Sequence, residues 1–127
     1  MTSLWGVVDD AAREARALMD SGLHRGAVGR AYYAIFTGAR ALITEQTGLP
    51  EGEVRRHAAV HKLFAEHLVH TDLLGAELAR GLRQSFNQRA EADYHGSSIA
   101  EHEAREAPTL MEVFLSAAAQ VRRTPRP

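Results

Sequence analysis

Apolar residues recur every three or four positions along most of the chain, and no stretch of any length alternates with a period of two. This spacing is typical of helices that bury one face, so the sequence predicts an all-α fold. Segment 24–46 is the most informative, because a bulky stripe runs beside a small-residue stripe. The two stripes comprise Val28, Tyr32, Ile35, Ala39 and Leu42, and Ala27, Ala31, Ala34, Gly38 and Ala41. Such a helix can pack against neighbours on two sides, so we predict that it lies at the centre of a helical bundle.

The same periodicity predicts four further helices, at about residues 3–21, 54–70, 71–94 and 99–122. Gly22 is placed to end the first helix, residues 47–52 break the chain after the second, and Thr71 is expected to cap the fourth. Pro108 falls inside the last helix, so we expect a kink or a late start there. Residues 1–122 are predicted to form one domain, and residues 123–127 a disordered tail.

Composition narrows the class of protein further. The chain has 127 residues, enough to build a core of its own, and a net charge of −1, which gives no hint of a broadly basic surface. It contains no cysteine, so disulfides and thiolate metal ligands are excluded. The first residues do not resemble a signal peptide, and no apolar run is as long as a membrane helix. We therefore expect a cytoplasmic protein that does not contact membranes.

Arg89 occupies an unusual position on the predicted fourth helix. Stepping from Leu78 through Leu82 and Phe86 to position 89 returns to nearly the same side of the helix, so an arginine lies on the apolar ridge. A guanidinium keeps its charge, and on a packed face it needs an anion partner or an opening to water or ligand. The simpler alternative is an intrahelical ion pair with Asp93, four residues further on.

His95 follows directly after the predicted end of that helix, next to Tyr94. Arg89 and His95 would point about 120° apart on an ideal helix, so the two side chains can cooperate only if the last turn unwinds. Gly96 makes this unwinding plausible. A histidine that titrates near neutral pH, beside an arginine that steadies charge on phosphate, is suited to metal-free cleavage of a phosphodiester.

A polar stripe on the predicted second helix is a candidate contact surface. Its members are Arg30, Tyr33, Thr37, Arg40 and Thr44. We expect this face to be exposed to water or to a partner, and Arg30, Tyr33 and Arg40 are the candidates for contacting RNA or a protein. A merely solvated face is the alternative.

Three segments in order resemble the helices of HEPN domain proteins. They are residues 26–36 (GAVGRAYYAIF), 57–71 (HAAVHKLFAEHLVHT) and 86–94 (FNQRAEADY). The resemblance implies an antiparallel up-and-down bundle of about five helices that commonly dimerises. Many members are metal-independent ribonucleases of toxin–antitoxin or defence systems, whose motif is an Arg followed by a His after four to six residues. Arg89 and His95 match that motif, with Asp93 and Tyr94 as supporting residues between them.

The resemblance leaves three functions to compare. The first is an endoribonuclease that acts on RNA as a homodimer, without cofactor or metal, with Arg89 and His95 of both chains lining one cleft. The second is a non-catalytic module that binds nucleotide or forms a complex with a nucleotidyltransferase, which could also serve as antitoxin. The third is an oligomeric helical scaffold. In a subgroup of the family the partner modifies a Tyr two residues after the His, where this chain has Ser97.

The remaining histidines offer a weaker alternative. His57 and His61 are four residues apart on a predicted helix, as zinc ligands can be, but two ligands leave a four-coordinate site half filled. We therefore predict no metal site and assign His57 and His67 to capping or surface contacts. Tyr32 and Tyr33 are interpreted first as a core aromatic and a dimer-surface aromatic.

Overall fold

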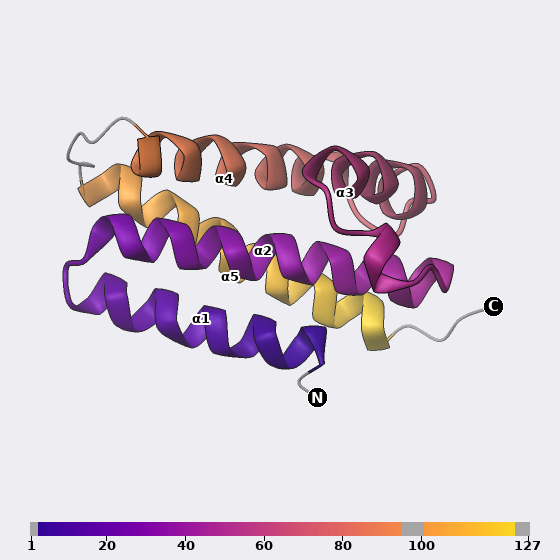
Figure 1. The fold of residues 1–127 in the computed structure, drawn as a ribbon, viewed down its shortest axis with the longest axis horizontal. Helices are drawn as coiled ribbons and strands as arrows, with labels where there is room; N and C mark the ends of the chain where they lie inside the picture. Colours follow the sequence, from indigo (N-terminus) through magenta and orange to yellow (C-terminus); the bar gives the residue numbers. More distant parts are fainter. Residues whose placement is uncertain (1–2, 95–100, 124–127) are drawn as a thin grey trace.

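The computed structural model describes residues 3–94 and 101–123, and their side chains except those of residues 88, 91–94 and 101–104. Five α-helices make up most of this part of the chain, and the predicted all-α fold is confirmed. Their bounds are α1 Leu4–Asp20, α2 His24–Thr47, α3 His57–Phe64, α4 Ala76–Tyr94 and α5 Glu101–Arg123 (Figure 1). No helix within the described ranges is both long and apolar enough to cross a membrane.

The four long helices lie lengthwise beside one another and alternate in direction, while the short α3 sits at one end of the bundle (Figure 1). The two described ends of the chain lie near that same end. Gly22 ends the first helix with a φ of +73°, a left-handed conformation that glycine adopts without strain. The antiparallel up-and-down bundle implied by the resemblance is therefore confirmed.

Helix α2 is the centre of the bundle, as its two stripes predict. It packs against α1, α3, α4 and α5. Both stripes are buried along their whole length. The small stripe allows close approach: a Cβ at Gly38 would lie only 2.9 Å from the Phe114 ring of α5. Thr37, which we expected on the exposed face, is 2% exposed because neighbours cover α2 on more than two sides.

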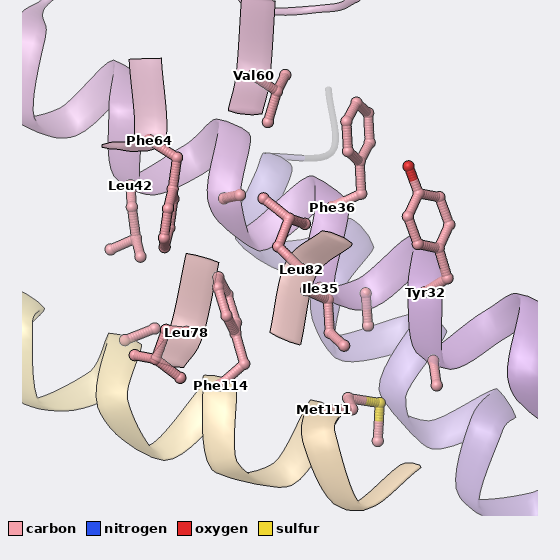
Figure 2. Close-up of a cluster of buried hydrophobic side chains, with 14 of the residues drawn as sticks. Tyr32, Ile35, Phe36, Leu42, Val60, Phe64, Leu78, Leu82, Met111 and Phe114 are labelled. Carbon is pink, nitrogen blue, oxygen red and sulfur yellow. The ribbon is translucent and has the colours of Figure 1, made fainter. Parts of the chain in front are cut away.

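The core is continuous from α1 to α5. Figure 2 shows Phe64, Leu78 and Phe114 packed together at one side of the cluster, and Tyr32 and Phe36 side by side at the other. Leu78 and Leu82 bring the apolar ridge of α4 into this core, as predicted, and Phe86 is half-buried at its edge. The end of the core that contains Tyr32 and Phe36 is where the candidate site lies.

The segment between α2 and α4 is less regular than predicted. In place of one helix over 54–70, the chain forms a short 3-10 turn, η1 (Glu51–Glu53), then α3, then a π-helical turn, η2 (Ala65–Val69). Helix α4 begins at Ala76, so the prediction that Thr71 caps it is wrong. The Thr71 hydroxyl instead donates to the His67 carbonyl at 2.7 Å, and the chain turns back so that the Leu74 N–H reaches the Leu68 carbonyl at 2.8 Å.

Helix α5 runs through Pro108, so a late start at that proline is wrong. Ala107 and Met111, on either side of the proline, are fully buried, and this packing favours the helical path despite the missing N–H. Arg123, which we assigned to the tail, is the last residue of α5. The predicted tail beyond it lies outside the described residues.

Candidate functional site

Four aromatic rings from three helices meet at one end of the core. Tyr32 and Phe36 are one helical turn apart on α2, so their rings stack, with centroids 5.6 Å apart. His57, the first residue of α3, lies over Phe36 at 4.5 Å and beside Phe86 of α4 at 4.7 Å. We call Tyr32, Phe36, His57 and Phe86 the aromatic cluster. It fixes the relative positions of α2, α3 and α4 at this point.

Arg89 lies over the Tyr32 ring of the aromatic cluster. It follows Phe86 by three positions on α4, so both side chains face α2. Its guanidinium carbon is 5.4 Å from the centre of the Tyr32 ring, which is the geometry of a cation–π contact. Arg89 is half-buried, as its predicted place on the apolar ridge requires. The ring therefore holds the guanidinium at the edge of the core, with its charge toward the opening described next.

A cleft of about 580 Å³ opens between α2, the start of α3 and the end of α4. The residues that line it are Arg25, Gly26, Gly29, Arg30, Tyr32, Tyr33, Phe36, His57 and Arg89. The described lining thus contains three arginines and no carboxylate. Arg30 lies over the Tyr33 ring at 5.4 Å and forms an exposed ion pair with Glu14 at 3.3 Å, and exposed pairs of this kind bind only weakly. The cleft is therefore suited to an anion with an aromatic part.

Two polar atoms of the aromatic cluster are shielded from water. The Tyr32 hydroxyl and the His57 Nε2 have no hydrogen-bond partner among the described residues. Burial raises the pKa of Tyr32, and the nearby Arg89 charge opposes this only in part. Burial also lowers the pKa of His57, and Arg89 lowers it further because two positive charges repel. Tyr32 is therefore protonated and His57 is held in the neutral form near pH 7.

The lowered pKa of His57 predicts a specific pH dependence of stability. The unfolded chain, in which this histidine titrates near its ordinary 6.5, binds the proton more readily than the folded chain. The free energy of unfolding should therefore fall as the pH drops below about 6.5. His57→Phe fills the same space without titrating, so its urea midpoint should fall less between pH 7 and pH 5. An equally steep fall in wild type and His57→Phe would contradict this.

The structure brings together only some of the residues predicted from sequence. Arg30 and Tyr33 of the polar stripe line the cleft with Arg89. Arg40 does not line it, because its guanidinium donates to the backbone carbonyls of Val54 and Glu51 and so holds the loop after α2. Asp93 and Tyr94 belong to the last turn of α4, but their side chains lie outside the described part. His95 also lies outside the described residues, so its pairing with Arg89 stays a prediction.

Sequence reasoning missed His57 as a member of the site. We assigned it to capping or surface contacts, but its ring lies against Phe36 and Phe86 in the aromatic cluster. The available signal was its place at the start of a helix within a segment that matched the resemblance. Neighbouring His61 also faces Phe86, at 6.3 Å, and burial lowers its pKa. Among the described side chains, no three His, Asp or Glu residues gather in the manner of a metal site.

Comparison with known proteins bears on the family of this chain. The HEPN domain family matches residues 9–121. A protein of Methanocaldococcus jannaschii named "Putative toxin MJ0605" is 32% identical over 109 residues, which cover 86% of this chain and 78% of the relative. The UPF0332 protein PH1297 of Pyrococcus horikoshii is 29% identical over 108 residues, which cover 85% and 71% of the two chains. A family match over nearly the whole bundle, in the order that the three resembling segments predicted, shows that this chain belongs to the HEPN domain family.

Proposed function

We propose that this chain is a toxin-like endoribonuclease that cleaves RNA without a metal ion and acts as a homodimer in a toxin–antitoxin or defence system. The observation that supports it most is the place of Arg89, held by the Tyr32 ring at the edge of a cleft with two further arginines. The name of one archaeal relative, "Putative toxin MJ0605", points the same way.

The proposed reaction is transfer of the RNA phosphate to the neighbouring 2′-hydroxyl, which breaks the bond to the 5′-oxygen of the next nucleotide. His95 acts as general base or acid, taking the proton of the 2′-hydroxyl or returning one to the leaving 5′-oxygen. Arg89 stabilises the additional negative charge that develops on the phosphate oxygens. The leaving strand ends in a 5′-hydroxyl and the other strand in a cyclic phosphate. No oxidant, metal or cofactor is needed to balance this step.

Expression in a bacterial host is expected to stop growth and to deplete cellular RNA if this function is correct. The effect should vanish in His95→Ala, since that variant keeps the guanidinium but loses the proton-transfer group. Western blotting at matched induction controls for expression level. Equal growth arrest by wild type and His95→Ala would contradict the proposal.

A dimer would place two copies of Arg89 in one shared cleft, where an anion must offset their repulsion. We therefore expect phosphate to tighten the dimer of the wild type and to have no effect on Arg89→Ala. Light scattering at several protein concentrations, with and without phosphate, measures this. A wild type that stays monomeric at high concentration would end the shared-cleft part of the proposal.

The second candidate is a non-catalytic module that binds a nucleotidyltransferase. The arginines of the cleft favour it to the same degree, because they would hold a nucleotide phosphate whether or not a bond is broken. The two candidates differ in one result: a purified chain that binds RNA and never cleaves it supports the module. In the endoribonuclease proposal, a nucleotidyltransferase-type protein is the antitoxin.

A further inference from the structure

Nothing in the described part of the structure requires a glycine at position 29. It lies within α2, where glycine is among the least favourable residues. A Cβ at this position would have no described atom within 4 Å, whereas one at Gly26 would lie 3.2 Å from Leu18 and one at Gly38 would lie 2.9 Å from Phe114. Its φ is not in the left-handed region. Packing and backbone geometry therefore explain Gly38 and account for Gly26 in part, but they do not explain Gly29.

What Gly29 does border is the cleft. Any side chain at this position would project from α2 into space that nothing else in the described structure occupies. Glycine leaves the helix backbone bare, so a flat group can approach it closely. The neighbouring walls are the rings of Tyr32, Phe36 and His57, and the arginines stand at the same opening. The described lining therefore combines an aromatic wall with a positively charged rim.

The two shielded polar atoms give the cleft a means of recognition. Tyr32 is only 2% exposed, and its hydroxyl lacks a partner among the described residues, as does the His57 Nε2. Nearly all buried polar groups in folded proteins are hydrogen-bonded, so we expect each atom to have a partner outside the described residues. A ligand that offers both a donor and an acceptor would satisfy them, and an aromatic base does so.

We propose that the cleft is a subsite for one nucleotide of single-stranded RNA, with its base against Gly29 and the aromatic wall and its phosphate at the arginine rim. Interleaved arginines and aromatic rings are the general means by which proteins hold unpaired nucleotides. The choice of RNA as the ligand rests on the proposed function. The assignment of Gly29, Tyr32 and His57 as the residues that select the base goes beyond it.

The test uses the His95→Ala protein, in which the proposed cleavage is disabled, and a fluorescent eight-nucleotide single-stranded RNA. Gly29→Leu is expected to weaken RNA binding at least tenfold in fluorescence anisotropy while leaving the unfolding temperature equal or higher. Gly52→Leu is the matched control, because Gly52 also has open space around it and does not line the cleft. It should bind RNA as its parent does. RNA binding by Gly29→Leu within twofold of the parent would overturn the subsite.

Tyr32→Phe provides a second variant that keeps the ring and removes only the hydroxyl. It should weaken RNA binding several-fold without lowering the unfolding temperature, because it removes a buried group that lacks a partner in the described protein. A merely structural tyrosine would show the opposite pattern, with lower stability and unchanged binding, and that result would overturn its role in recognition.

Two competitors identify the ligand. An eight-unit RNA backbone without bases should compete at least tenfold more weakly than the intact RNA, and equal competition would overturn the base subsite. Free 5′-mononucleotides should also compete more weakly than RNA, and stronger competition would overturn RNA as the source.

The proposed function and the subsite can fail separately. If the wild type never cleaves RNA but Gly29→Leu abolishes RNA binding, the subsite stands. If cleavage kinetics are the same in the wild type and in Gly29→Leu, the subsite fails and the function stands.

Discussion

Replacing Arg89 with alanine is expected to lower kcat/KM for RNA cleavage by about 10²- to 10³-fold, the usual effect of removing one group that stabilises charge in a transition state. The guanidinium lies over the Tyr32 ring, and Arg30 would have to leave its own contact with Tyr33 to take that position. The fold should survive, because an exposed or half-exposed cation–π contact contributes only about 0.5–1 kcal/mol. Single-turnover cleavage of a short labelled RNA measures the effect.

Arg89→Lys is the informative control for this variant. Lysine keeps the positive charge but has neither the planar group that lies on Tyr32 nor the paired donors that match a phosphate. It should recover only part of the lost rate. Full activity in Arg89→Ala, with circular dichroism showing an intact helical fold, would remove Arg89 from the proposed site.

Phe64→Ala is expected to have the largest effect on stability, a loss of about 3–5 kcal/mol in the free energy of unfolding. Phe64 is fully buried at the point where α3 gives way to the π-helical turn, and its ring stacks on Phe114 at 6.0 Å. The cavity would remove the contact between the Phe64 ring of α3 and the Phe114 ring of α5. Since domains of this size have a total stability of about 5–15 kcal/mol, the variant should lie near the limit of folding.

Urea unfolding followed by circular dichroism measures this loss. Leu63→Ala is the matched control on the same helix, because Leu63 packs only against the edge of the core. Leu63→Ala should lose less than half as much free energy of unfolding as Phe64→Ala. Similar losses in the two variants would show that the core is less tightly packed around Phe64 than the structure indicates.

Helix periodicity was sufficient to predict the bundle because the buried residues repeat at fixed spacing. The two stripes of α2 are the clearest case, since two adjacent apolar stripes on one helix require neighbouring helices on two sides. The same reasoning failed between α2 and α4. There the backbone follows contacts that are distant in sequence: Arg40 holds the carbonyls of Val54 and Glu51, and Leu74 turns back to Leu68. Periodicity carries no information about such bonds.

From the sequence, the candidate site could be predicted only for residues that share one helix. Arg89 was identified because its position on α4 relative to Leu82 and Phe86 follows from helical geometry alone. Helical geometry could not identify His57 and Gly29, because they border the cleft through the packing of α3 and α4 against α2. Resemblance to the family suggested the Arg89 and His95 motif, and the cleft beside Arg89 emerged only from the structure.

The most direct test of the proposed function is RNA cleavage by the purified protein in excess chelator. Wild type and His95→Ala, matched in purity and in helical content, are incubated with mixed RNA, and the new 5′-hydroxyl ends are counted by labelling. Metal-free cleavage by the wild type and a loss of about 10²- to 10⁴-fold in His95→Ala are the predicted results. Cleavage that stops in chelator and returns with a divalent ion, or equal cleavage by both proteins, would contradict the account.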